Sequence, residues 1–264
     1  MIAKLLKLLP EHRTYVEPFC GAAAIFFAKA PSEVETLNDI HSGVVGLFRI
    51  LRDNTDEFMH LARHTPYSRE LWFECRDNWE NEPDPTKRAW MWWYVACTSF
   101  SGLWGRSIST SVSRPARGMA DTCSKFLSRI DMLPAMVERL RQTQIEHVDG
   151  VYCLERYCTA DGLAYVDPPY VAATRTTGKY QHEFSDDAHS RLVDALLHLP
   201  GRFMVSGYQH SLYQPLDDAG WSRTDYETAC YASPRTRHTG ILGEGSATTA
   251  AKRVESVWVN PPDA

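Results

Sequence analysis

The tetrapeptide Asp167-Pro168-Pro169-Tyr170, directly after the apolar run Gly162–Val166, limits the fold and chemistry of this chain more tightly than any other segment. The run has the length and composition of a buried strand, so the tetrapeptide lies at the carboxyl end of that strand. Ligands of open α/β sheets bind at this edge. The Asp167 carboxylate and the Pro168 carbonyl can accept two hydrogen bonds from an amino group on a flat ring, and Tyr170 offers a stacking face. An ordinary proline-rich turn is the alternative.

A second motif, EPFCG at residues 17–21, follows a short β-rich stretch at 14–17. Its glycine and the three alanines after it allow a helix to begin close to a bound ligand. Asp39 follows a second short strand at 35–38, at about the 20-residue distance by which nucleotide-binding βαβ units place an acidic residue on a ribose. The glycine pattern is not that of dinucleotide sites, so a single adenosine-bearing ligand is favoured. A purely structural strand-to-helix turn is the alternative.

The order of the remaining patterns predicts an α/β protein with a parallel, doubly wound sheet. From about residue 55 to residue 143 strand signals nearly vanish and aromatic-rich helical patterns dominate, with a tryptophan-rich segment at 89–95 that we interpret as core. We therefore expect a sheet domain formed by residues 1–54 and 144–264, and an α-helical insertion at 55–143. Helices are expected at 42–53, 124–141 and 186–199, and further strands at 144–149, 202–206 and 253–259.

The formal net charge of −5 argues against a protein that coats nucleic acid non-specifically. Three acid-free loops nevertheless carry basic residues: one at 102–118, one after the proline-rich motif and one at 231–240. A face that contacts phosphates would need such loops, and the alternative is that they are merely solvated. Their basic side chains are Arg106, Arg114, Arg117, Arg175, Lys179, Arg235 and Arg237.

The seven cysteines are irregularly spaced, and the closest pair, Cys153 and Cys158, lacks zinc-site spacing. We therefore expect reduced cysteines, a cytoplasmic location and no metal. Lysines interrupt the leucines of Met1–Pro10 and no small-residue cleavage site follows, so an amphipathic helix is favoured over a signal peptide. No apolar stretch approaches the roughly 20 residues that span a bilayer, so no membrane association is expected.

Several segments together resemble motifs of the DNA adenine methylases, the Dam family. Val16–Phe27 is similar to motif I, Leu37–Ile40 to motif II and Tyr165–Tyr170 to motif IV. Thr98–Arg106 is similar to the DNA-reading loop of that family, and Val254–Pro261 to its last strand. The order and spacing of the motifs also match, and the similarity covers nearly the whole chain.

The resemblance implies a Rossmann-like, S-adenosylmethionine-dependent methyltransferase sheet with an inserted α-helical DNA-recognition domain. It implies that the acceptor is the N6 amine of an adenine in a short site of double-stranded DNA. It also implies a protein encoded by a bacterium or a phage. Asp167, Pro168, Pro169 and Tyr170 would then hold the target adenine. The cofactor contacts would fall on Glu17, Pro18, Phe19, Cys20, Gly21, Asp39, Ile40 and Asp149, the last at the donor's base, and Ser101 would join the basic residues above in binding DNA.

Methyl transfer to an aromatic amine suits the residues of motif IV. The amine's lone pair is delocalised, and hydrogen bonds to Asp167 and to the Pro168 carbonyl would turn the nitrogen toward tetrahedral geometry and direct the pair at the sulfonium methyl. No metal or covalent intermediate is required. Because a paired base is inaccessible, the adenine must be flipped out of the duplex, and stacking on Tyr170 would offset part of that cost.

The chain departs from the family at two places. The family's usual Gly-Gly-Lys element would precede residue 1, and Lys4 is the nearest candidate for its lysine. Gly105 shifts Arg106 by one place relative to the arginine of the reading loop. We therefore predict a site that contains adenine and leave its sequence open.

Other functions are weighed against this one. Enzymes that methylate cytosine N4 more often carry Ser-Pro-Pro-Tyr, and those that methylate protein glutamine carry Asn-Pro-Pro-Tyr, so Asp167 and the helical insertion count against both. A DNA-binding regulator or decoy with an impaired active site is a further alternative. A cognate restriction endonuclease, a phage role and a housekeeping role are all compatible with the sequence, and a monomer is the default expectation.

Overall fold

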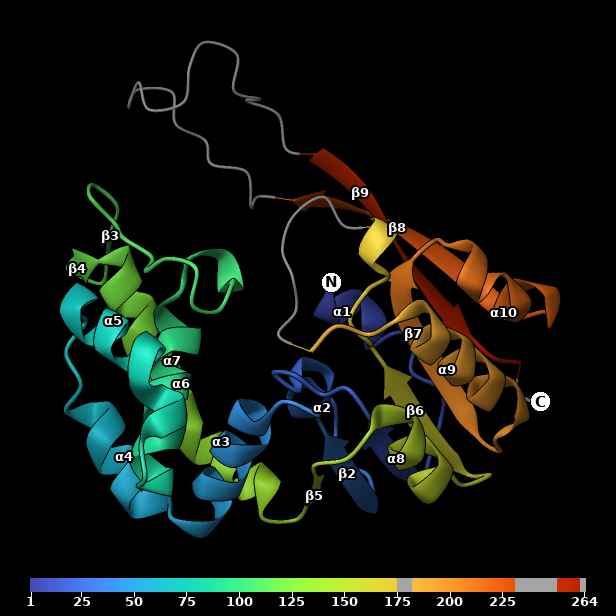
Figure 1. Ribbon diagram of the computed structural model, residues 1–264, viewed down its shortest axis with the longest axis horizontal. Coiled ribbons are helices and arrows are strands. Elements are labelled where there is room, and N and C mark those ends of the chain that lie inside the picture. Colours follow the sequence, from blue (N-terminus) through green and yellow to red (C-terminus); the bar gives the residue numbers. More distant parts are fainter. Residues whose placement is uncertain (175–181, 231–250, 262–264) are drawn as a thin grey trace.

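The computed structural model describes residues 1–174, 182–230 and 251–261, without the side chains of Ser101 and of residues 228–230 and 251–253 (Figure 1). In the described residues β1, β2, β5, β6 and β7 run parallel to one another, and β9 lies between β7 and β8 and runs antiparallel to both. The predicted α/β class with a mainly parallel sheet is confirmed. The spatial order of the sheet is β5 (Gln144–Glu146), β2 (Val34–Asn38), β1 (Thr14–Glu17), β6 (Gly162–Val166), β7 (Arg202–Tyr208), β9 (Ala251–Val259) and β8 (Ser222–Cys230).

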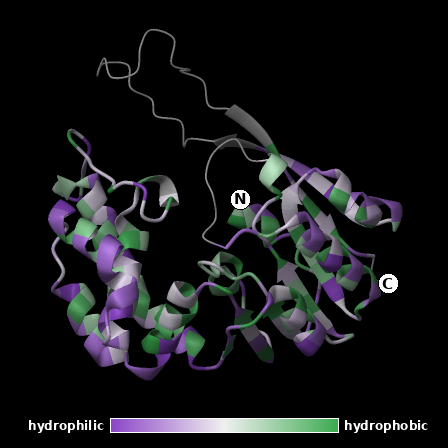
Figure 2. Ribbon diagram, viewed as in Figure 1, coloured by the Kyte–Doolittle hydropathy of each residue, from purple (hydrophilic) through white to green (hydrophobic). Residues whose placement is uncertain are grey.

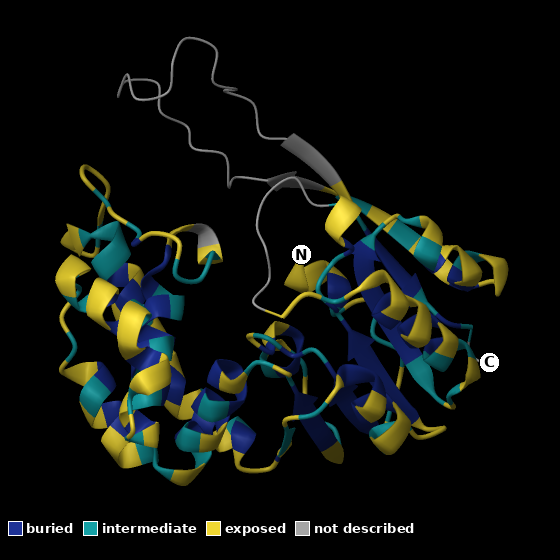
Figure 3. Ribbon diagram, in the orientation of Figure 1, coloured by how far each residue is buried: buried dark blue, intermediate teal, exposed yellow. Residues whose placement is uncertain are grey.

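Helices cover both faces of the sheet, so its central strands are buried on both sides (Figure 3). Alternate residues of a strand point to opposite faces. Ala164 and Val166 therefore join one hydrophobic cluster, with α8 (Gly150–Tyr157), α9 (Asp186–His198) and α10 (Gln214–Asp218). Leu163 and Tyr165 join the other cluster, with α2 (Ala24–Ala28) and α3 (Ser42–Asp53). In Figure 2 hydrophobic residues recur along the sheet and are interspersed with more polar ones.

Between β2 and β5 the described chain is mainly helical, and these helices lie to one side of the sheet (Figure 1). After α3 come α4 (Thr55–Arg63), α5 (Arg69–Asn78), α6 (Pro85–Thr98) and α7 (Asp121–Leu140). Helix α6 has a well-defined start, because the Asp84 carboxylate accepts hydrogen bonds from the N–H groups of Thr86 and Lys87 and Pro85 occupies the first turn. A short hairpin of β3 (Pro115–Ala116) and β4 (Met119–Ala120) precedes α7.

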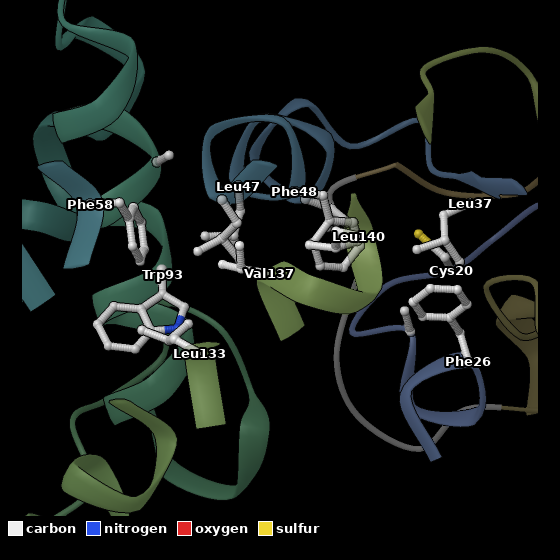
Figure 4. Close-up of a cluster of buried hydrophobic side chains, with 14 of the residues drawn as sticks. Cys20, Phe26, Leu37, Leu47, Phe48, Phe58, Trp93, Leu133, Val137 and Leu140 are labelled. Carbon is white, nitrogen blue, oxygen red and sulfur yellow. The ribbon is translucent and has the colours of Figure 1, made fainter. Parts of the chain in front are cut away.

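One hydrophobic core joins the helices to the sheet (Figure 4). Phe58 and Trp93 lie at its helical end, Val137 of α7 lies in the middle, and Phe26 and Leu37 lie at the sheet end. Trp93 is only 5% exposed, so the tryptophan-rich segment contributes to the core as predicted. The helices therefore pack on the sheet without a separate core of their own.

A buried ion cluster lies at the same junction. Glu35 of β2 is 2% exposed and accepts hydrogen bonds from Lys29 at 2.7 Å and from Arg139 of α7 at 2.8 Å. Lys29 also lies over the ring of Tyr15, 4.2 Å from its centroid. These charges tie α7 to the second strand.

Some boundaries differ from the sequence-based expectations. Helix α1 (Ile2–Leu5) ends well before Pro10, with turns after it. Strand β5 stops at Glu146 because the chain turns into α8, whose N-terminal cap is Asp149. Neither α8 nor β8 was predicted, and β8 has mainly polar residues at an edge of the sheet, so no apolar alternation marks it. No described helix is long and apolar enough to cross a membrane.

Candidate active site

A cavity of about 520 Å³ opens where β1, β2 and β6 end. Strands β1 and β6 are neighbours in the sheet. From β1 the chain continues to β2 on one side, and from β6 it continues to β7 on the other side. Open α/β sheets bind ligands at such a point, where the strand order reverses. Loops after the three strands form most of the wall, and α1 and β9 complete it. No lysine or arginine side chain is among the described residues that line it. Four carboxylates line the cavity, those of Glu17, Asp39, Asp167 and Glu255.

Glu17, the last residue of β1, is 1% exposed. Its Oε1 accepts hydrogen bonds from the Tyr15 hydroxyl at 2.7 Å and from the N–H of Phe26, in α2, at 2.8 Å. No basic side chain forms an ion pair with it in the part of the chain that the structure describes. Burial raises the pKa of Glu17 to about 8, although both hydrogen bonds act in the other direction. The cavity therefore contains a buried carboxyl group that a cationic ligand would stabilise in its charged form.

The loop after β1 turns sharply beside the cavity. Gly21 and Ala23 have φ values of 48° and 50°, a region that glycine enters freely and alanine at a cost of about 1–2 kcal/mol. The N–H of Gly21 donates to Asp39 Oδ2 at 2.8 Å, and the N–H of Cys20 donates to the Asn38 carbonyl at 2.9 Å. The segments that resemble motifs I and II of the family are thus bonded to one another.

Asn38 and Asp39, at the end of β2, hold neighbouring loops together. The Asn38 amide donates to the carbonyls of Pro18 at 2.8 Å and Val148 at 3.0 Å, and Asp39 Oδ1 accepts from the N–H of His41 at 2.8 Å. The fully buried Asn38 was not predicted as a site residue. Its position directly before the predicted site residue Asp39 was the available signal.

Asp167 is held from the neighbouring strand β7. Ser206 Oγ donates to Asp167 Oδ1 at 2.8 Å and lies 3.0 Å from the Tyr165 hydroxyl. Burial raises the pKa of Asp167 to about 6, and the charge of Glu255 acts in the same direction, while the Ser206 hydrogen bond lowers it. At neutral pH the carboxylate is therefore ionised and able to accept hydrogen bonds. Ser206 was not predicted, because its contact depends on the pairing of β6 with β7.

Tyr170 is oriented by two contacts. Its hydroxyl donates to Glu255 Oε1 of β9 at 3.1 Å. Its ring meets the ring of Tyr208 edge to face, with centroids 4.7 Å apart. Pro168 and Pro169 also line the cavity, so the whole predicted tetrapeptide lies at its wall.

The predicted cofactor residues divide into two groups. Asp149 does not line the cavity, and its Oδ1 accepts from the N–H groups of Val151 and Tyr152 as the cap of α8. Pro18 lies behind the wall, where its carbonyl accepts from Asn38. The contact predicted between Asp149 and the donor's base remains a prediction. The predicted cofactor residues that do line the cavity are Glu17, Phe19, Cys20, Gly21, Asp39 and Ile40.

Lys4, the nearest candidate for the family's N-terminal lysine, does not line the cavity. Its Nζ lies 5.0 Å from the ring centroid of Tyr226 in β8. Met1, Ile2 and Leu5 of the same segment do line it. Segment 1–5 therefore contributes apolar wall, and the lysine faces the edge of the sheet.

His41 connects the cavity to the helical region, which the sequence analysis did not predict. Its ring stacks on Trp79 with centroids 6.0 Å apart and lies 5.6 Å from Trp92 of α6. Its Nδ1 accepts from the N–H of Gly43 at 3.0 Å, which caps α3. A Cβ atom at residue 43 would lie 2.3 Å from the Trp92 indole, so this packing requires glycine.

The predicted DNA contacts are described only in part. Arg106 and Arg114 are exposed in the 102–118 loop. The guanidinium of Arg117 donates to Ser124 Oγ and Ser128 Oγ, each at 2.8 Å, so it holds the loop against α7. The side chain of Ser101 and the residues Arg175, Lys179, Arg235 and Arg237 lie outside the described structure.

Comparison with known proteins gives consistent matches. The family model for D12 class N6 adenine-specific DNA methyltransferases matches residues 1–232. The type II methyltransferase M1.LlaDCHI of Lactococcus lactis subsp. cremoris is 25% identical over 206 residues, which cover 74% of this chain and 71% of that protein. The DNA adenine methylase of Serratia marcescens is 26% identical over 199 residues, or 70% and 69% of the two chains. That of Escherichia coli (strain K12) is 31% identical over 99 residues, or 36% and 35%.

Proposed function

Because this chain belongs to the D12 class of N6 adenine-specific DNA methyltransferases, we propose that its cavity holds S-adenosylmethionine beside an adenine flipped out of the duplex. The observation that carries this proposal is the meeting of three motif loops at one cavity of about 520 Å³. Glu17, Asp39 and Asp167 come from these loops. Small-molecule sites commonly have volumes of about 300–1,000 Å³.

The donor side suits a cationic, adenosine-bearing molecule. Glu17 lacks a basic partner among the described residues, so a positive ligand would compensate its buried charge. Phe19 and Gly21 would border the methionine and ribose, and Asp39 with Ile40 the ribose and base. When bound, S-adenosylmethionine supplies a sulfonium methyl group, and the electron pair of the broken C–S bond returns to sulfur as the N–C bond forms.

On the acceptor side, the Asp167 carboxylate and the Pro168 carbonyl would accept the two N6 hydrogens of adenine. Ser206 fixes the carboxylate, and Tyr170 provides a stacking face. With a pKa of about 6, Asp167 is ionised near neutral pH and can take up the proton that leaves N6. The proton then passes to solvent.

We assign residues 55–143 to target recognition, and residues 1–54 with 144–264 to catalysis. The exposed Arg106 and Arg114 would contact phosphates or base edges, whereas Arg117 would act by holding the loop on α7. Contact of the Trp79 and Trp92 rings with His41 at the cavity wall supports communication between the two parts. Ser101, Arg175, Lys179, Arg235 and Arg237 remain candidates that would extend the DNA surface.

The deciding experiment measures transfer of labelled methyl from S-adenosylmethionine to unmethylated bacterial DNA, with modified bases and their context read by sequencing. We expect N6-methyladenine in one short motif. The matched control is Asp167→Ala, which should retain donor binding by calorimetry and lose transfer. Absence of incorporation by folded wild-type protein that binds the donor would contradict the proposal, and N4-methylcytosine would redirect it.

We further propose that the protein acts as a monomer, which light scattering of the protein with and without DNA would test. A cognate restriction endonuclease is the proposed partner. In that case, DNA methylated at the sequenced motif should resist an endonuclease that cleaves unmethylated copies of the same motif. A housekeeping or phage role would not require such an endonuclease.

A further inference from the structure

Glu255 is a cavity carboxylate that no predicted motif role explains. It lies on β9, the antiparallel strand, and its Oε1 accepts the Tyr170 hydroxyl at 3.1 Å. Glu255 is paired in register with Tyr208 of β7, so the two side chains emerge on the same face of the sheet. Tyr208 in turn contacts the ring of Tyr170 edge to face. Two adjacent strands therefore hold one aromatic side chain of the loop after β6.

This arrangement matters because a loop tyrosine is otherwise free to rotate about its side-chain bonds. An edge-to-face contact alone fixes the ring weakly. A hydrogen bond to a charged acceptor is stronger and defines where the hydroxyl lies. Tyr170 is half-buried, so one side of the ring stays accessible from the cavity.

We propose that Glu255 is a positioning residue for methyl transfer, which fixes the ring of Tyr170 through the tyrosine hydroxyl and completes the acceptor side of the cavity. The proposal rests on the function proposed above, in which Tyr170 receives the flipped adenine. Glu255 does not touch the reacting atoms in this scheme. It determines where the base comes to lie relative to Asp167.

Glu255 also influences the charge of Asp167. The charged groups that face Asp167 are carboxylates, Glu255 from β9 and Glu17 from β1, and the neighbouring titratable groups are the tyrosines at 165, 170 and 213. The negative charge of Glu255 raises the pKa of Asp167, in the same direction as burial. Removal of that charge should therefore lower the pKa of Asp167.

The test compares Glu255→Gln, Tyr170→Phe and the double variant by steady-state kinetics on DNA that carries the sequenced motif. Each single change should lower kcat by about 10- to 100-fold, as expected for the loss of a hydrogen bond to a charged group, with little change in the KM for donor. The double variant should be no slower than the slower single variant, because both changes remove one interaction. Additive losses would overturn the proposal.

The pH profile separates positioning from a general structural role. In Glu255→Gln the acid limb of kcat should move to lower pH, because a negative charge beside Asp167 is removed. Glu255→Asp keeps the charge but shortens the side chain by one methylene, so its rate should fall without the shift to lower pH. An unchanged acid limb in Glu255→Gln would overturn the proposal.

The matched control is Tyr157→Phe, which removes the hydrogen bond between the Tyr157 hydroxyl and Glu146, away from the cavity. It should leave kcat and the acid limb unchanged. If Glu255→Gln does not fold, Tyr170→Phe and Glu255→Asp carry the test, because each should still lower kcat with little change in the KM for donor. Normal kcat values in both variants would then overturn the proposal.

A readout that does not depend on turnover is the titration of the Asp167 carboxyl carbon by NMR. In Glu255→Gln this carbon should titrate at lower pH than in the wild type, and in Tyr157→Phe at the same pH. If the titration shifts in Glu255→Gln but the wild-type protein never methylates adenine, the influence of Glu255 on Asp167 is retained. The proposed function is then the part that is contradicted. A normal rate together with an unshifted titration in Glu255→Gln would overturn the inference while leaving the proposed function intact.

Discussion

Glu17 and Glu35 lie on neighbouring parallel strands, and their side chains are almost equally buried, at 1% and 2% exposure. Glu35 is held between Lys29 and Arg139, whose hydrogen bonds lower its pKa although burial alone would raise it. Within the described structure the hydrogen-bond donors to Glu17 are the Tyr15 hydroxyl and one backbone N–H, and its pKa is raised to about 8. One carboxylate is compensated within the fold, and the other lies at the cavity wall.

The difference shows where the fold places basic side chains next to buried carboxylates. At the junction of β2 with α7, two cations neutralise one buried carboxylate and join two parts of the chain. At the cavity, four carboxylates form part of the wall, and no lysine or arginine side chain is among the described lining residues. A buried charge that the protein itself leaves uncompensated favours binding of a ligand with the opposite charge.

The largest expected effect is on the compensated carboxylate. Glu35→Gln should lower the free energy of unfolding by about 3–5 kcal/mol, because it leaves Lys29 and Arg139 without their shared acceptor. Donor binding at the cavity should change little in the protein that remains folded. Urea denaturation measures the loss, and Glu33→Gln, which removes an exposed ion pair with Arg13, should cost under about 1 kcal/mol. Equal stabilities for the two variants would break the comparison.

Asp167→Asn tests the cavity side of the comparison. It should leave folding stability nearly unchanged and lower methyl transfer by at least ~100-fold, equivalent to ~3 kcal/mol, because the amide presents its NH₂ group where an acceptor is needed. Labelled-methyl incorporation is the measurement. Asp161→Asn, at the exposed ion pair with Arg13, is the control with normal turnover expected. Rapid turnover by the Asp167 variant would place the reaction elsewhere.

Glu17→Gln sharpens the comparison through pH. The folded-state pKa of Glu17, about 8, exceeds the ordinary value of 4.5, so the folded protein retains a proton that the unfolded chain loses. Its contribution to stability is complete below about pH 4.5 and is lost as pH rises toward 8. The variant should show a flatter fall in unfolding free energy over this window, and a donor affinity weaker by roughly 10-fold in calorimetry. An unchanged pH slope would mean that another group dominates.

The smallest effect is expected in the 102–118 loop. Arg106→Ala should reduce the slope of log affinity for DNA against log salt by ~0.9 if the side chain contacts one phosphate. Arg117→Ala is the paired control, because its guanidinium is bonded to Ser124 and Ser128 and should leave that slope unchanged. Fluorescence anisotropy at several salt concentrations gives both slopes. A larger change in the Arg117 variant would reverse the roles of the two arginines.

The sequence predicted those parts of the structure that local patterns specify. Helix α3 was predicted at its observed limits, Ser42–Asp53, because its apolar residues recur with helical spacing. Each of the three motif loops was predicted to follow a strand, and residues of all three line the cavity. Ser206 and Glu255 were missed because their contacts depend on which strands pair, β6 with β7 and β7 with β9, and no local pattern encodes that choice.

The continuous core of Figure 4 has a consequence for how the molecule melts. Since Trp93, Val137 and Phe26 belong to a single packed cluster, the helices and the sheet should unfold in one cooperative transition, with coincident loss of tryptophan fluorescence and far-ultraviolet signal. A chimera that exchanges only the helical segment for that of a relative would place new side chains against the sheet side of this cluster, which packs against the present ones. New DNA specificities are therefore more readily obtained by altering the surface loop than by replacing the helices as a cassette.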